Sequence, residues 1–269
     1  MTKQLTTYFV LAYILSWVIW FPLYGHIFGI NNLPDIPFNH GIGGFGPLLS
    51  AFLTTWIYKG KMQLLSFAKG LFRVKPVIYI AIALLSPFLL AGIAGIVSFL
   101  IKDIPINLAG LFTSHEFPEL NFIQFFFYNF VCFGLGEETG WRGFVLPHLQ
   151  NKYNALKSSI IVTVFWALWH LPVFFYDNGF MDMNIGEIFG WFFSLLTGSI
   201  LLTWIYNSSK ASVLACAVFH TTINIAFSAD FIDNLTVMLM GVFITLWGIL
   251  TIRFFKPKNL SKNNRVINY

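Results

Sequence analysis

The sequence predicts an all-α protein, a polytopic transmembrane bundle of about eight helices. Hydrophobic residues make up 57% of the chain, charged residues only 10%, and the mean hydropathy is +0.72, all far from soluble globular proteins. A helix needs about 20 apolar residues to cross a bilayer. Runs of this kind are found at 5–25, 41–58, 76–101, 121–141, 156–176, 186–207, 211–228 and 232–255.

The first apolar run is expected to remain in the protein as a helix. Lys3 is the only charged residue before it, and no small-residue cleavage site follows it. A removed signal peptide would have both a positively charged start and such a cleavage site. Cys132 and Cys216 lie inside apolar runs, where thiols behave as small buried hydrophobes, so no disulfide framework is expected. With no repeat and no long linker, residues 1–269 are predicted to form a single integral membrane domain, and 256–269 a mobile polar tail on the cytoplasmic side.

The charged residues of the loops sort onto two sides if the eight helices alternate in direction. One side receives Lys3, Lys59, Lys61, Lys69, Arg73, Lys75, Lys152, Lys157, Lys210, Arg253, Lys256, Lys258, Lys262 and Arg265. The other receives Asp35, Asp103, Glu116, Glu119, Asp177, Asp182, Glu187, Asp230 and Asp233, with Lys102 as its one strong base. By the positive-inside rule the basic side, with both termini, is cytoplasmic. The predicted location is therefore the cell membrane. Topology and lipid contact explain the +5 net charge, and no nucleic acid partner is expected.

Three charged residues remain at membrane depth, in the stretch GLGEETGWRGFVLPHLQ at 134–150. Ionisable groups there are costly unless they are paired or face a polar cavity, and they often mark functional sites. Glu138 and Arg142 are four residues apart, the spacing of an intrahelical ion pair, so their role can be purely structural. Glu137 points about 100° away around the helix and needs another partner.

Two histidines in apolar helices are candidates for that partner. His170 and His220 each lie about 15–20 Å deep at 1.5 Å of rise per residue, and Asn224 shares one helical face with His220. A lone histidine in an apolar helix is commonly a satisfied core residue, but two histidines and a spare carboxylate favour a site. The remaining histidines, expected at loops or helix ends in contact with solvent, are His26, His40, His115 and His148.

Small residues predict close helix packing beside the carboxylates. Gly136 and Gly140 form a small-xxx-small face, against which a neighbouring backbone can pack. Pro172, directly after the His170 turn, removes a backbone donor and is expected to kink the helix and free carbonyl groups. A wet cavity is the expected result.

These residues resemble the three motifs of the CAAX-protease and bacteriocin-processing family of intramembrane glutamic endopeptidases, which includes CAAX prenyl endopeptidase. The matching elements are Glu137–Glu138–x–x–x–Arg142, an aromatic residue four before His170, and His220–x–x–x–Asn224. The resemblance covers about 90 residues, from 134 to 224, and implies a catalytic core at 121–228. Trp166 stands where the family usually has Phe. The resemblance implies peptide hydrolysis without an acyl-enzyme, in a cavity open to the cytoplasm and the bilayer.

The chemistry of these residue types fits hydrolysis. We expect Glu137 to act as the base, His170 to orient the water or share its proton, and His220 with Asn224 to bind the oxyanion. Glu138 and Arg142 are expected to hold the helix and tune Glu137. No cofactor is expected. A zinc site built from two histidines and a glutamate stays open, although no H-E-x-x-H occurs. The sequence contains no G-x-S-x-G motif, so a serine nucleophile is not supported.

Two other function classes stay open. Buried carboxylates and histidines also form proton relays in transporters, although no inverted repeat is evident. A non-proteolytic immunity or scaffold protein of the same family is the third hypothesis. The expected partners are the lipid bilayer and a membrane-tethered or lipid-modified peptide or protein. The sequence does not select between prenylated tails, peptide precursors and bacteriocin-related substrates.

Overall fold

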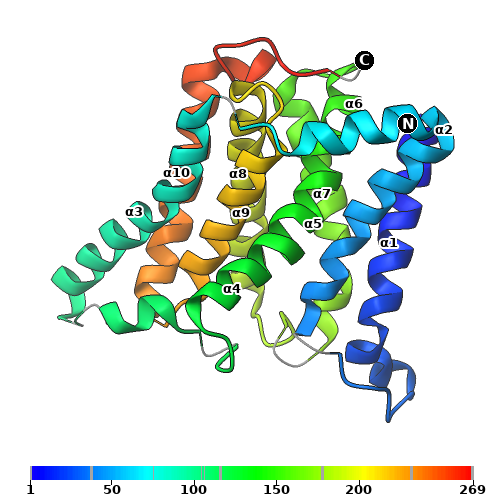
Figure 1. The fold of residues 1–269 in the computed structure, drawn as a ribbon. Coiled ribbons are helices and arrows are strands. Elements are labelled where there is room, and N and C mark those ends of the chain that lie inside the picture. Colours follow the sequence, from blue (N-terminus) through cyan, green and yellow to red (C-terminus); the bar gives the residue numbers. More distant parts are fainter. Residues whose placement is uncertain are drawn as a thin grey trace.

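The computed structural model describes residues 2–36, 39–74, 76–103, 105, 107–114, 117–176, 179–230 and 233–267. Lys75, His115, Glu116 and Asp177, considered above, lie outside these residues. Within the described part every regular element is helical, and eight long helices are present (Figure 1). The predicted fold class is confirmed.

Seven of the long helices are α1 (Lys3–Tyr24), α2 (Phe45–Leu71), α3 (Val77–Lys102), α7 (Ala155–Trp169), α8 (Ile185–Ser208), α9 (Val213–Ser228) and α10 (Asn234–Asn259). Of these, α2 is kinked at Gly60 and α10 at Lys256. The eighth runs over 122–150 as α4 (Phe122–Tyr128), η4 (Asn129–Leu135), α5 (Gly136–Glu138), η5 (Thr139–Val145) and α6 (Leu146–Gln150). Its segments η4 and η5 are π-helical. Short 3₁₀ segments are η1 (Gly25–Phe28), η2 (Asn39–Gly44), η3 (Leu108–Phe112) and η6 (Leu171–Phe175).

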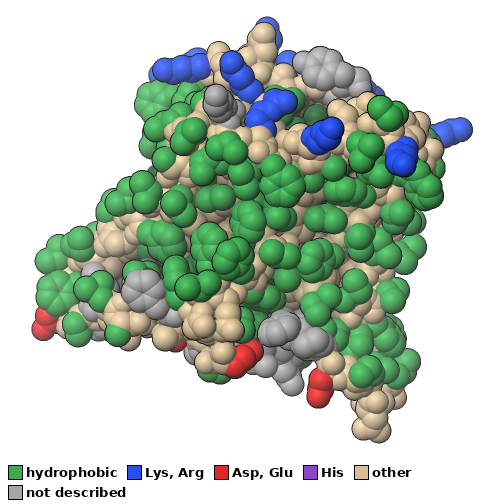
Figure 2. Space-filling view, viewed as in Figure 1, with side chains coloured by type: hydrophobic (Ala, Val, Ile, Leu, Met, Phe, Trp, Pro, Cys, Tyr) green, Lys and Arg blue, Asp and Glu red, His purple; other side chains and the backbone are tan. Residues whose placement is uncertain are grey.

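The surface and interior have the inverted polarity of a membrane protein. Among the described residues, five stretches are long and apolar enough to span a bilayer: Lys3–Phe28, Val77–Lys102, Ala155–Phe175, Ile185–Ser208 and Asn234–Asn259. Hydrophobic side chains cover the sides of the molecule (Figure 2), while many buried side chains are Ser, Thr or Ala. Small and weakly polar residues are what close helix packing in lipid requires. The chain is therefore a multi-pass membrane protein.

Helix α2 continues beyond its predicted end at residue 58. Gly60 has φ 75° and ψ 179°, a conformation that side chains disfavour, and it kinks the helix. Residues 61–71 then run across the end of the bundle near the N-terminus (Figure 1). The basic segment 59–75 was expected to be a loop; its described part instead includes this helical arm.

Helix α7 ends earlier than predicted. His170 is its C-cap, and Pro172 lies at the start of the following 3₁₀ segment η6. Proline cannot supply the N–H that would continue the helix, so it ends the helix and does not kink it. The sequence suggested that His170 lies within a helix, but it lies at the end of one.

Arg265 and Val266, near the end of the described chain, form hydrogen bonds with the bundle. The backbone N–H of Val266 donates to Asn207 Oδ1 at 3.0 Å, and its carbonyl accepts from Gln150 Nε2 at 2.6 Å. Arg265 Nε donates to the Gln150 carbonyl at 3.0 Å. These bonds place Arg265 and Val266 against α6 and α8.

The two ends of the bundle carry opposite charges. On the face in Figure 2, Lys and Arg gather at the end where Figure 1 places both termini, and Asp and Glu lie at the opposite end. Helix α9 packs against α3 and η4, well inside the bundle. The interrupted helix and α9 thus bring the predicted site residues into the protein interior.

Candidate active site

The two neighbouring carboxylates lie on α5, a single α-helical turn between two π-helical segments. Glu137 is 2% exposed and Glu138 is fully buried. Helical π segments are rare and are frequent at functional sites, because the wider turn changes where the side chains point. The carboxylates are therefore set in an irregular and closely packed part of the fold.

Glycines allow other backbones to approach this turn. A Cβ atom on Gly136 would lie 2.7 Å from the Gly44 carbonyl oxygen, and one on Gly134 would lie 2.7 Å from that of Ala217. A Cβ on Gly140 would lie 2.8 Å from the Pro47 carbonyl oxygen. Such distances are too short for any side chain, so the predicted close packing beside the carboxylates is confirmed.

Glu138 joins two helices through one oxygen. Its Oε1 accepts from Arg142 NH1 at 2.9 Å and from His220 Nδ1 at 2.9 Å. The intrahelical ion pair expected from the spacing is therefore present, with both side chains fully buried. The contact with His220 was not anticipated, and it fixes α9 against the turn that carries the carboxylates.

Glu137 finds its partner in an indole. Trp166 Nε1 donates to Glu137 Oε2 at 2.6 Å. Among the described residues, Glu137 Oε1 has no hydrogen bond partner. The surrounding protein atoms do not fully enclose this oxygen. This oxygen is free to accept a hydrogen bond from a water or a substrate.

His170 lies beside the same indole. Its Nδ1 is 2.8 Å from the Trp166 carbonyl oxygen, so Nδ1 carries the proton and Nε2 has the lone pair. The ring is half-buried and packs edge-on against Trp169 and Trp191, with centroids 4.8 and 5.7 Å away. The imidazole is thus fixed with an unprotonated nitrogen free to accept.

Asn224 lies one turn after His220 on α9. His220 is 7% exposed, and Asn224 is half-buried. The Asn224 carbonyl accepts from the Ser228 hydroxyl at 2.8 Å, while its side-chain amide bonds to no described residue. The amide and the His220 Nε2 atom are therefore both available to a ligand.

Trp166 connects these predicted residues. Besides its bonds to Glu137 and His170, its ring is 5.5 Å from the His220 ring, and the Arg142 guanidinium carbon lies 4.5 Å from the ring centroid. The sequence had marked Trp166 only as a departure from a family pattern. An indole N–H buried in an apolar helix needs an acceptor, and this was the signal that could have identified it.

His40 is a further residue that the sequence reasoning missed. It lies on η2, its ring packs 5.3 Å from Phe133 and 6.3 Å from Tyr176, and its Nδ1 is buried without a described partner. The expectation that it contacts solvent is wrong for Nδ1, and nothing in its sequence context distinguished it from the other loop histidines.

The carboxylates and histidines described above do not form a metal site. Among the described residues, no group of three or more His, Cys, Asp or Glu side chains is arranged to hold a metal ion. Glu138 and His220, two residues of that kind, are instead bonded to each other. What the site offers is one carboxylate with a free oxygen, two imidazoles with accessible Nε2 atoms and one carboxamide.

Comparisons with known proteins agree with this geometry. Residues 119–226, which include all of these carboxylates and histidines except His40, match the family described as Type II CAAX prenyl endopeptidase Rce1-like. The chain is also similar to CAAX prenyl protease 2 of Methanococcus maripaludis, with 27% identity over 243 residues that span 81% of this chain and 82% of that protein. The resemblance inferred from the motifs is confirmed: residues 119–226 of this membrane protein match the Rce1-like CAAX prenyl endopeptidase family, and both similarities indicate a peptidase.

Proposed function

We propose that this protein is an intramembrane endopeptidase that hydrolyses a peptide bond with a water activated by Glu137 and His170. The observation that carries the proposal is the shared contact of both side chains with Trp166. The Trp166 indole N–H holds Oε2 of Glu137, and the Trp166 backbone carbonyl holds Nδ1 of His170. Each side chain keeps one acceptor atom for the same water.

In the proposed reaction Glu137 removes a proton from the water as the oxygen attacks the scissile carbonyl. A second acceptor at His170 Nε2 orients the water or shares its proton. Glu137 then delivers the proton to the leaving amine, as a general base that becomes a general acid. No covalent intermediate with the protein is needed.

His220 and Asn224 are proposed to stabilise the oxyanion. With Nδ1–H donated to Glu138, His220 can offer a donor from Nε2 only as the imidazolium. The Glu138 carboxylate favours that charged form, and the Asn224 amide supplies a neutral donor one turn away. Glu138 therefore acts through His220 and not on the substrate, and Arg142 holds Glu138 in place.

The substrate is proposed to be a membrane-tethered peptide, with a lipid-modified C-terminal tail as the first candidate. The similar protein from Methanococcus maripaludis is described as a CAAX prenyl protease, which supports testing prenylated tails first. Residues 121–228 form the proposed catalytic core of one domain spanning 1–269. The end rich in Lys and Arg, with both termini and the tail at 256–269, is proposed to face the cytoplasm.

The decisive experiment uses purified protein in lipid nanodiscs and a fluorogenic peptide that ends in Cys-aliphatic-aliphatic-X. The peptide is presented farnesylated, palmitoylated or unmodified. We expect cleavage of the lipidated peptides and little of the unmodified one. A protein that binds these peptides but leaves all of them intact would favour the non-proteolytic hypothesis, whereas proton or solute flux without cleavage would favour a transporter. Neither the fold nor the comparisons support those alternatives at present.

A further inference from the structure

A second polar site lies at the end of the bundle that carries both termini. A cavity of about 390 Å³ opens between the arm of α2, the turn from α8 to α9, and residues 263–267. We call it the tail pocket. Gly143 and Pro147, from the helix that carries the proposed catalytic carboxylates, form part of its wall.

The tail pocket has uncompensated positive charge. Arg73, Lys210 and Arg265 line it, and none of its described lining residues is Asp or Glu. Two of the cations are fixed by neutral groups: Arg73 donates to the Lys210 carbonyl, and Arg265 donates to the Gln150 carbonyl at 3.0 Å. Their positions are thus determined while their charges remain unneutralised by any described carboxylate.

The hydroxyl group of a largely buried tyrosine also lines this cavity without a described hydrogen bond partner. Tyr206 is 4% exposed and lines the pocket, and its hydroxyl makes no hydrogen bond to a described residue. The Asn264 amide adds a further donor at the rim, and so does the second N–H of the Asn263 amide, whose first donates to the Ser208 carbonyl at 3.0 Å. Cations, a hydroxyl and amides together match an anion with several oxygen atoms.

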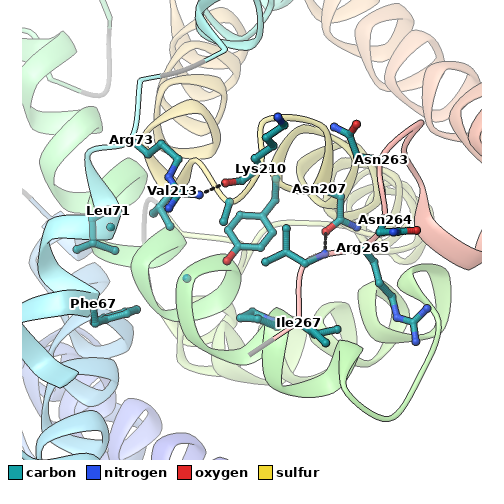
Figure 3. Close-up of a pocket in the computed structure, with 16 residues that line it drawn as sticks. Phe67, Leu71, Arg73, Asn207, Lys210, Val213, Asn263, Asn264, Arg265 and Ile267 are labelled. Atoms are coloured by element: carbon teal, nitrogen blue, oxygen red, sulfur yellow. Dashed lines mark hydrogen bonds between the residues drawn. The ribbon is translucent and has the colours of Figure 1, made fainter. Parts of the chain in front are cut away.

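The two rims of the pocket differ in character. In Figure 3, Arg73, Lys210 and Asn263 lie along one rim, and Phe67, Leu71 and Ile267 lie along the other. A free inorganic anion needs only the first rim. A phosphate ester with an apolar or glycerol substituent fills both.

We propose that the tail pocket binds a phosphate group, carried by an anionic phospholipid headgroup or by a soluble phosphate compound. The ligand would contact the α2 arm, the α8–α9 turn and the C-terminal residues at once. It would therefore tie three separate parts of the chain to the wall formed by Gly143 and Pro147. This binding is independent of peptide hydrolysis, so it can be tested whether or not the proposed function holds.

The test uses the full-length protein in neutral detergent, with melting temperature as the readout. One arm titrates phosphatidylglycerol into the micelles, with phosphatidylcholine as the neutral lipid, and a second arm titrates inorganic phosphate at constant ionic strength. Saturable stabilisation by phosphatidylglycerol alone identifies a lipid headgroup as the source. Saturable stabilisation by inorganic phosphate identifies a soluble one.

The double variant Arg73→Gln with Lys210→Gln should raise the half-saturating concentration at least about tenfold, because each charged hydrogen bond to phosphate is among the stronger kinds. The matched control is Lys69→Gln with Lys262→Gln, which removes the same charge from exposed positions that do not line the pocket. The control should stay within about twofold of the unmodified protein. An equal rise in the half-saturating concentration for both double variants would show that general surface charge causes the binding, and it would overturn the proposal.

Tyr206→Phe provides the second test, because it removes only a hydroxyl and keeps the ring. We expect the half-saturating concentration to rise by a few fold, with the ligand-free melting temperature unchanged. This variant decides the question if the Arg73 and Lys210 double variant does not fold. The proposal fails if neither ligand stabilises the protein saturably, or if Tyr206→Phe binds as tightly as the unmodified protein.

Discussion

The substitution Glu137→Gln separates the proposed chemistry from the fold. Trp166 Nε1 lies 2.6 Å from Glu137 Oε2, and a glutamine can present its carbonyl oxygen to the same indole. Its NH₂ group then occupies the position of the free carboxylate oxygen, where a donor replaces an acceptor. The water loses the atom that would take its proton.

The expected loss of rate follows from that exchange. General base catalysis contributes roughly 10²–10⁴-fold, which at about 1.4 kcal/mol for each factor of ten is roughly 3–5 kcal/mol of barrier. The folded state should change little. The neutral hydrogen bond to Trp166 is weaker than the charged one, but a carboxylate that is 2% exposed no longer has to be buried. Stability should match or slightly exceed that of the unmodified protein.

The assay measures cleavage of the lipidated fluorogenic peptide in nanodiscs together with the melting temperature of each preparation. Glu119→Gln is the matched control, because it makes the same chemical change at an exposed position. We expect Glu119→Gln to cleave normally. A Glu137→Gln protein that folds and retains more than about a tenth of the activity would show that the base is elsewhere and that the mechanism proposed above is wrong.

Four further outcomes are expected. Arg142→Ala leaves Glu138 with His220 as its one described partner and should cost about 3–5 kcal/mol, seen as low yield and a lowered melting temperature; normal stability would contradict the ion pair's structural role. Asn224→Ala should bind peptide normally but lower the rate about 10²–10³-fold, measured as kcat against KM; an unchanged kcat would remove it from the oxyanion site. A cysteine introduced within 59–75 should react with impermeant reagents only after cells are opened, and labelling of intact cells would reverse the proposed orientation. Cleavage should survive exhaustive chelation with much less than one zinc per chain, whereas loss of activity restored by zinc would give Glu137 and the histidines ligand roles.

The helical architecture was predictable because membrane burial imposes long apolar runs on the sequence. Seven of the eight predicted runs each correspond to one long α-helix, and the run at 121–141 corresponds to the helix interrupted by π-helical segments. The errors are at positions where one residue decides the local backbone. Gly60 redirects α2 at a point where hydropathy is already falling, and Pro172 ends α7 where apolar character continues. Hydropathy alone reports burial in lipid and does not report backbone direction.

Which residues form the candidate site was easier to predict from the sequence than which of them contact one another. Spacing on one helix identified the Glu138–Arg142 pair, because residues four apart share a face. Spacing carries no information on which residue of another helix lies opposite. The partner of Glu137 was sought among the histidines, but it is the Trp166 indole, and His220 bonds to Glu138. Only the tertiary packing of α7 and α9 determines these pairs.

The π-helical segments explain why the helix that carries the carboxylates is hard to read from sequence. Each π bulge inserts about one extra residue, and in a helix of 3.6 residues per turn one inserted residue rotates the following side chains by about 100°. Segments η4 and η5 lie on either side of Glu137 and Glu138, so the faces on which residues before 129 and after 145 lie do not follow from counting. The glycines at 134, 136 and 140 compensate locally, because they let the Ala217, Gly44 and Pro47 carbonyls approach the distorted turns. The carboxylates thereby point into the protein interior in directions that differ from those in an undistorted helix of the same sequence.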